Sequence, residues 1–167
     1  MLTPQMSTSQ PPKCQPPPPY NPSDIRLMKD FQEIHELLPD VKIIFPNPST
    51  NREFHVFISP DRGFWHRGKF EFKFVVTRKW PEDRPKIKCL TKVWHPSITE
   101  EGFVDLGNIQ TNYYPTTTIC QIICYILFLF HEPNFDYWFN PQSEQFKRDP
   151  EGFKLKVDEY IEKYCPK

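Results

Sequence analysis

The chain has 167 residues, enough for one domain with a sizeable hydrophobic core. Its 21 Lys and Arg balance its 21 Asp and Glu, and this zero formal net charge argues against nonspecific binding to nucleic acid, which depends on a basic surface. There is no long apolar run and no signal-like N-terminus, so the sequence predicts no membrane segment and a location in the cytoplasm, the nucleus or both. The five Cys show no metal-ligand spacing, so we expect free thiols, no metal site and no cofactor.

Residues 1–21 are predicted to form a disordered, Pro-rich tail, and residues 22–167 one folded domain. The run QPPKCQPPPPY at residues 10–20 cannot form a helix or a central strand, because proline lacks an N–H donor. The simplest interpretation is a solvated spacer. The alternative is a ligand for a WW-domain protein, since these domains bind Pro-Pro-x-Tyr segments and Pro17, Pro18 and Tyr20 match that pattern.

A helix is predicted over residues 23–38, with Ser23 or Asp24 as its N-cap and Pro39 as its stop. The charged residues Arg26, Lys29 and Asp30 lie on what we interpret as a solvated face. The other side of the helix is expected to be one buried apolar stripe with a spacing of three or four residues. Its members are Ile25, Met28, Phe31, Ile34 and Leu38.

Four strand signals follow, at residues 41–45, 53–59, 69–77 and 86–90. The third signal is the clearest, because Phe70, Phe72 and Phe74 alternate with polar residues, as in a strand with one buried face. A helix followed by four successive strands predicts an α+β domain, with an antiparallel meander sheet packed on the helix.

Two further helices are predicted after the strands. Residues 116–130 are apolar nearly all round, which indicates a buried helix, and we interpret its Cys120 and Cys124 as core residues. The last helix is expected to begin with Asp149 as its cap and Pro150 in its first turn. Its predicted buried residues are Phe153, Val157 and Ile161.

Residues 94–115 read WHPSITEEGFVDLGNIQTNYYP. This segment resembles the active site of the ubiquitin-conjugating enzyme (UBC) family, where His-Pro-Asn precedes Gly-x-x-Cys-Leu and then Trp-x-Pro before a helix. His95, Pro96 and Ser97 match the first part. Asp105 lies ten residues after His95 and ten before Pro115, which is the position of the family's nucleophilic Cys. The resemblance therefore places a carboxylate where the family has a thiol.

The resemblance extends from about residue 24 to the C-terminus. The segment WPEDRPKI at residues 80–87 resembles the family's turn before its fourth strand, and Asn140 and Glu144 match the entry into a further helix. The segments FPNP at 45–48, KCLTK at 88–92 and VDEYI at 157–161 look most like the second neddylation-conjugating enzyme branch. What this implies is the UBC fold: an N-terminal helix, a four-stranded antiparallel meander sheet, an active-site loop and then C-terminal helices.

The resemblance also implies partners: a ubiquitin-like modifier of cullins, its activating enzyme, and a RING ligase or a co-ligase. In the family, the first helix and the turn before the fourth strand receive activating enzymes and ligases. This implies partner contacts at Arg26, Lys29, Asp30 and Trp80.

The N-terminus offers one more implied contact. In the resembled branch an acetylated N-terminus is the handle for the co-ligase, and Met1 and Leu2 match it, although Pro4 departs from the helix-prone continuation. Acetylation removes the terminal charge, so Met1 and Leu2 could enter an apolar pocket without burying an ammonium group.

The family's reaction needs a sulfur nucleophile, because a thiolate both attacks a thioester and leaves from one readily. Attack by Asp105 would give a mixed anhydride, which hydrolyses quickly. Ser97 also replaces the Asn that supports the oxyanion, and its hydroxyl donates from a shorter arm. These two changes favour a non-catalytic binding or regulatory variant in the cullin neddylation pathway.

Two alternatives stay open. The protein could be an active conjugating enzyme that uses another thiol, although none of the candidates has an evident cation or helix start that would lower its pKa. It could also be an adaptor that binds WW domains through its tail. The candidate thiols are those of Cys14, Cys89, Cys120, Cys124 and Cys165.

Overall fold

The computed structural model describes residues 21–136 and 141–165. Residues 1–20 of the predicted tail, with Met1, Leu2, Pro17, Pro18 and Tyr20, therefore lie outside the described residues, and the disorder of this segment and its two suggested contacts stay predictions. The same holds for Asn140.

The first helix, α1, spans Pro22–Leu37. It begins one residue earlier than predicted, because the Asn21 side chain accepts a hydrogen bond from the Ser23 N–H and Pro22 occupies the first turn. The predicted stripe was wrong at its first two positions, since Ile25 and Met28 are 43% and 62% exposed. The buried side of the helix is formed instead by Ser23, Leu27, Asp30 and Ile34.

The four predicted strands are confirmed, each with slightly shorter bounds. They are β1 (Lys42–Ile44), β2 (Glu53–Ile58), β3 (Phe70–Val75) and β4 (Lys86–Cys89), and they form one antiparallel sheet in the order β1-β2-β3-β4. Burial alternates strictly along β2 and β3, so one face of the sheet is apolar and the other is partly solvated.

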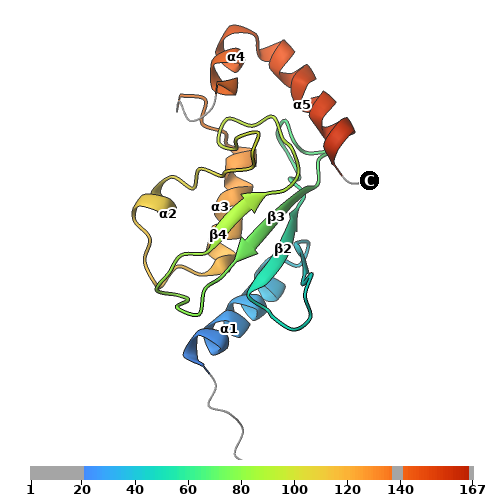
Figure 1. The fold of residues 1–167 in the computed structure, drawn as a ribbon. Coiled ribbons are helices and arrows are strands. Elements are labelled where there is room, and N and C mark those ends of the chain that lie inside the picture. Colours follow the sequence, from blue (N-terminus) through green and yellow to red (C-terminus); the bar gives the residue numbers. More distant parts are fainter. Residues whose placement is uncertain (1–20, 137–140, 166–167) are drawn as a thin grey trace, which may run out of the picture.

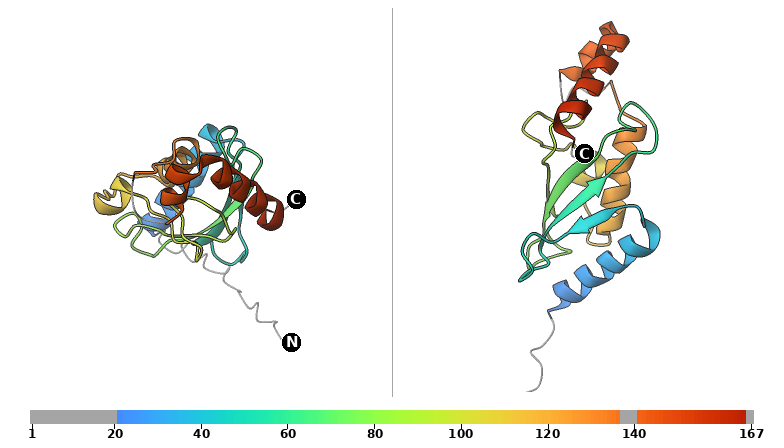
Figure 2. Two further views of the ribbon diagram at one scale, coloured as in Figure 1. Left: turned by 90° about the horizontal axis from the view of Figure 1, so that it is seen from above. Right: turned by 90° about the vertical axis from the view of Figure 1, so that its right-hand side faces the viewer.

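The apolar face of the sheet is covered by α3, which spans Ile119–His131 (Figures 1 and 2). Phe130 of α3 stacks on Phe70 of β3 with 4.7 Å between ring centroids. Thr118 and Gln121 form a reciprocal capping box that fixes the start of α3. Two residues depart from the predicted all-round burial, because Cys124 and Phe128 are exposed.

Helix α1 lies at one end of an elongated molecule, and the last two helices lie at the other end (Figures 1 and 2). At one end, α1 packs Phe31 against Phe54 of β2 at 4.9 Å. At the other end lie α4 (Gln142–Arg148) and α5 (Pro150–Tyr164), and Asp149 caps α5 as predicted. Phe153, Val157 and Ile161 of α5 are buried, which confirms the sequence prediction.

Candidate functional site

The segment that resembles an active site forms an irregular loop between β4 and α3. Isolated bridges join His95 to Ile98 and Ile98 to Val104, so the loop folds back on itself. A third bridge joins Phe103 to Lys88, and the Cys89 N–H donates to the Gly102 carbonyl over 2.8 Å, which attaches the loop to the edge of β4. The segment that leads into Asp105 is therefore held by backbone contacts to β4 and within the loop.

Gly102 is required for this attachment. Its φ of +88° is a conformation that side-chain-bearing residues rarely adopt, and a Cβ there would lie 2.0 Å from the Cys89 carbonyl oxygen. This close backbone approach gives a physical reason for the glycine in the motif.

His95 is fully buried and has a structural role. The Ser97 N–H donates to its Nδ1 over 2.9 Å, so Nδ1 is unprotonated, and Nε2–H donates to the Leu129 carbonyl over 3.0 Å. Burial lowers the pKa of His95 to about 3, only partly opposed by the bond to Leu129. The imidazole is therefore neutral and positions the loop on α3, and it is enclosed too completely to exchange protons with a substrate. Pro96 beside it is also buried.

Asp105 is half-buried and points back into its own loop. Its N–H donates to the Ser97 carbonyl over 2.9 Å, and its Oδ1 accepts from the Gly107 N–H over 2.9 Å. The structure thus brings Asp105 and Ser97 together, as the resemblance predicts. Ser97 is only 9% exposed.

Two neighbours of Asp105 were not singled out from the sequence. A Cβ on Gly107, whose φ is +51°, would lie 2.6 Å from the Tyr125 hydroxyl. Burial, and after it the negative charge of Asp105, raises the pKa of that hydroxyl. Gly107 also begins α2 (Asn108–Thr111), a helix too short for periodicity to predict.

Three of the four described thiols are poorly suited to act as the nucleophile in place of position 105. Cys89 is buried and donates to the Thr91 carbonyl, and burial raises its pKa to about 12. The pKa of Cys120 is raised to about 12, mainly by burial and to a smaller extent by the neighbouring Cys124. Burial also raises the pKa of Cys165. A high pKa leaves little thiolate at neutral pH. Cys124 is the exposed thiol among those described.

The residues implied as partner contacts divide into two groups. Lys29 is exposed on α1 and can reach a partner. Asp30 and Trp80 are only 1% and 2% exposed, so the interpretation of Asp30 as a solvated charge was wrong, and neither side chain is available for direct contact. Arg26 is half-buried between them and the loop before α3.

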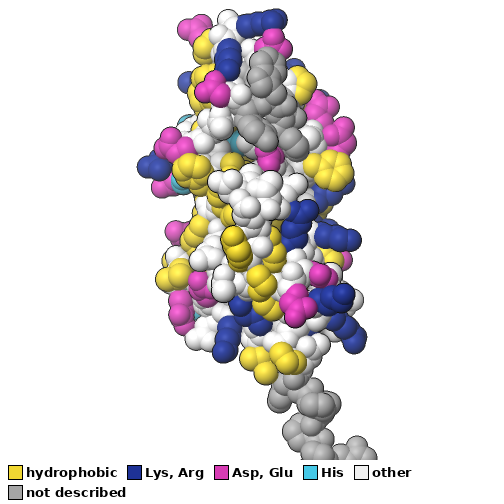
Figure 3. Space-filling model, turned by 90° about the vertical axis from the view of Figure 1, so that its left-hand side faces the viewer, with side chains coloured by type: hydrophobic (Ala, Val, Ile, Leu, Met, Phe, Trp, Pro, Cys, Tyr) yellow, Lys and Arg dark blue, Asp and Glu magenta, His cyan; other side chains and the backbone are white. Residues whose placement is uncertain are grey.

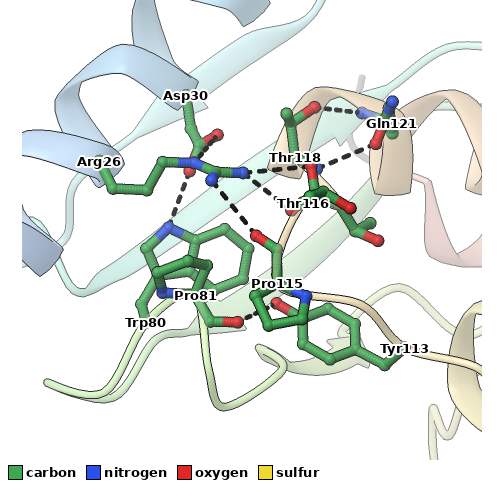
Figure 4. A network of polar contacts seen from close by, with 10 residues as sticks. Arg26, Asp30, Trp80, Pro81, Tyr113, Pro115, Thr116, Thr118 and Gln121 are labelled. Carbon is green, nitrogen blue, oxygen red and sulfur yellow. Dashed lines mark hydrogen bonds and ion pairs between the residues drawn. The ribbon is translucent and has the colours of Figure 1, made fainter.

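These buried residues form one polar network (Figure 4). The Trp80 indole N–H donates to Asp30 Oδ2 over 2.8 Å, and Arg26 Nε donates to Asp30 Oδ1 over 3.2 Å. The guanidinium of Arg26 then donates to three successive carbonyls, those of residues 115, 116 and 117. Tyr113 Oη donates to the Pro81 carbonyl over 2.6 Å. The network therefore joins α1, the turn before β4 and the loop before α3.

Replacing Trp80 with Phe tests the network. The change removes one donor from a buried carboxylate, so we expect a loss of about 1–3 kcal/mol in the free energy of unfolding, measured by chemical denaturation. Trp94→Phe is the matched control, because the Trp94 indole N–H has no hydrogen-bond partner among the described residues. Equal losses in the two variants would mean that the Trp80–Asp30 bond contributes nothing beyond packing.

Within residues 21–136 and 141–165, no group of three or more His, Cys, Asp or Glu side chains could hold a metal ion. No helix in the same residues has the length and apolar character needed to cross a membrane.

Comparisons with known proteins agree with this geometry. A family model described as "Ubiquitin-conjugating enzyme" matches residues 26–161. The NEDD8-conjugating enzyme UBE2F of Rattus norvegicus is 38% identical over 151 residues, covering 85% of this chain and 82% of that protein. The NEDD8-conjugating enzyme ubc12 of Schizosaccharomyces pombe is 33% identical over 138 residues, with 82% and 77% covered. Among solved structures, S. cerevisiae Ubc12 superposes with a TM-score of 0.73 at 28% identity, over 83% of this chain and 76% of that one.

Proposed function

Because this chain belongs to the ubiquitin-conjugating enzyme family, we propose that it acts in the NEDD8 pathway as a binding or regulatory variant that forms no thioester. Its relatives named as NEDD8-conjugating enzymes support the choice of pathway. In this function the domain presents the surfaces of a conjugating enzyme to the modifier, its activating enzyme, a ligase or a co-ligase, and it transfers nothing.

The observation that carries the proposal is the environment of Asp105. The loop retains the backbone contacts that hold this position, while the side chain is a carboxylate that accepts from the Gly107 N–H. Attack by a carboxylate in this position would give a mixed anhydride, which water hydrolyses quickly. It would not give a stable adduct of the kind that a thiol reagent releases. Three of the four described thiols have raised pKa values, which opposes substitution by another cysteine.

We expect the wild-type protein to form no reducible adduct with NEDD8 when it is incubated with the NEDD8-activating enzyme and ATP. The physical reason is the missing thiol at position 105. Intact-protein mass spectrometry under non-reducing conditions measures the outcome, and a conjugating enzyme with a catalytic Cys serves as the positive control. An adduct that is lost on adding a reducing agent would contradict the proposal. Cys124→Ser would then test whether the exposed thiol is responsible.

The binding role is tested in the same mixture. If the domain occupies the activating enzyme, an excess of it should slow the loading of the active conjugating enzyme. Lys29→Glu should weaken this competition, because Lys29 is exposed on α1 and its charge is reversed. Lys42→Glu is the matched control, since Lys42 is also exposed but lies on β1 at the sheet edge. Undiminished loading at all concentrations would remove the activating enzyme from the list of partners.

A further inference from the structure

A hollow lies away from the candidate site, at the end of the molecule that carries α4 and α5. It encloses about 590 Å³ between the connection from β2 to β3, the end of α3 and α5 (Figures 1 and 2). Sites of this volume hold small ligands or short peptide segments. Figure 3 shows instead the side on which α2 lies in Figure 1, where apolar side chains form a band bordered on one side by Lys and Arg. The lining of the hollow, within the described part of the chain, includes no residue from 94–117, so the two places are separate.

The floor of the hollow is apolar and held by packing. It is formed by Phe64, Phe130 and Pro133. Phe64 packs edge-on against Phe153 of α5 with 5.7 Å between ring centroids, and Phe130 is stacked on Phe70. Phe64 and Pro133 are half-buried, so part of each side chain stays open to a ligand. A partner could therefore bury an apolar side chain here without first ordering the site.

Cationic side chains line the rim of the hollow. Arg67 Nη2 donates to Asp158 Oδ1 over 2.6 Å, so the guanidinium is oriented while its other N–H groups are not used by the described residues. Lys154 lies one turn before Asp158 on α5, so the two share a helix face, and among the described residues Lys154 has no ion-pair partner. His66 Nδ1 donates to the Gly63 carbonyl over 2.9 Å, which holds the ring in the lining. The rim therefore offers donors to an anion.

The acidic side chains around the hollow are already close to bases. The pairs are Asp158–Arg67, Asp61–His131 and Glu132–Arg62, at 2.6, 2.8 and 4.0 Å. Glu151, three residues before Lys154, does not line the hollow and forms no ion pair with it. Two cations and one carboxylate in the lining leave a single positive charge when the histidines are neutral. This charge matches one carboxylate better than a doubly charged phosphate, which Asp158 would repel.

We infer that this hollow binds a segment of a partner protein that carries one carboxylate next to a large apolar side chain. The carboxylate lies between Arg67 and Lys154, and the apolar side chain lies against Phe64 and Pro133. In an extended segment residues two apart share a face, so the sequence Glu-x-Leu presents both groups together. The inference goes beyond the proposed function and does not depend on it, because Asp105 does not line the hollow. The domain would then hold one partner here while another contacts the candidate site.

An NMR titration of the full-length protein with two peptides tests the inference. The probe is Ac-Gly-Glu-Gly-Leu-Gly-NH2, and Ac-Gly-Gln-Gly-Leu-Gly-NH2 is its uncharged control. We expect the Glu peptide to shift the amide signals of Gly63 and Arg67 saturably. It should bind at least about fivefold more tightly than the Gln peptide, which corresponds to about 1 kcal/mol.

A charge reversal at Lys154 adds a second test. Lys154→Glu should remove the preference for the Glu peptide, because it replaces the unpaired cation with a carboxylate. Lys42→Glu is the matched control, since Lys42 is also exposed but lies on β1, and its reversal changes the net charge equally. It should keep the preference of the wild type. Both side chains are exposed, and the spectra themselves show whether each variant is folded.

Four results would overturn the inference. Equal affinities for the two peptides would show that the cations do not select the ligand. The absence of saturable shifts at Gly63 and Arg67 would show that the hollow does not bind such a segment. Equal losses in Lys154→Glu and Lys42→Glu would assign the preference to net charge. Signals of the hollow that change on dilution without peptide would assign it to a second copy of this chain.

Discussion

Replacing Asp105 with Cys should give a protein that forms a reducible NEDD8 adduct in most molecules, whereas we expect no such adduct for the wild type. The backbone at this position is already held by the bond from the Asp105 N–H to the Ser97 carbonyl and by the bridge between Ile98 and Val104 just before it. Cys is close to Asp in size, and the side-chain bond it loses within the described part of the chain is the one from the Gly107 N–H. Because thioester exchange joins reactants and products of similar energy, a correctly placed thiol is its main requirement.

The same assay as for the wild type measures this gain, with Asn108→Cys as its matched control. Asn108 is exposed three residues further along, so a thiol there shows whether any nearby sulfur is enough. Adding Ser97→Asn to Asp105→Cys should raise transfer to a lysine amine by about 10²–10³-fold, which is the usual contribution of one oxyanion donor. If Asp105→Cys stays unloaded while the protein is folded, the prediction is wrong, and the residue at position 105 does not by itself determine whether an adduct forms.

The second large effect concerns acid stability. The pKa of His95 is about 3 in the folded protein and about 6.5 when unfolded, so the unfolded chain binds more protons between these values. The stability contributed by neutral His95 is therefore complete above pH 6.5 and decreases as the pH falls toward 3. We expect a loss of about 1.4 kcal/mol per pH unit in this window from this residue. Urea denaturation at a series of pH values measures the slope.

The control for this prediction is a second histidine. His66 is exposed, so His66→Gln should leave the pH slope unchanged. His95→Gln should be less stable at neutral pH, because Gln cannot reproduce both bonds to Ser97 and Leu129, and its slope should be flatter. A wild-type slope that matches that of His95→Gln would mean that the acid sensitivity comes from other groups.

The sheet and the end of the chain were predictable because local patterns and tertiary packing agree there. The alternation of Phe70, Phe72 and Phe74 is the alternation of burial in β3, and Asp149 with Pro150 begins α5. The first helix was mispredicted because its buried face includes a carboxylate. Asp30 is acceptable there only because Trp80, fifty residues later, and Arg26 satisfy it, and no periodicity within the helix contains that information.

In the candidate site, too, some features could be predicted from the sequence and others depend on tertiary contacts. The family resemblance implied that Asp105 and Ser97 share one site, and the structure brings them together through the bond from the Asp105 N–H to the Ser97 carbonyl and the bridge between Ile98 and Val104. Spacing could not show that His95 is fully enclosed, since this depends on Leu129 of α3. It also could not separate the buried Cys120 from the exposed Cys124, because every side of that helix is apolar in sequence.

The three carbonyls held by Arg26 have a consequence for recognition. Tyr114, Pro115 and Thr116 are exposed, yet the backbone beside them is fixed by a guanidinium that is itself anchored on buried Asp30. Exposure and conformational freedom are therefore separate properties in this loop. A partner that binds here meets a surface already in one conformation, and little of its binding free energy is lost to ordering the loop. The surface around residues 113–117 is in this sense preorganised, whichever protein it meets.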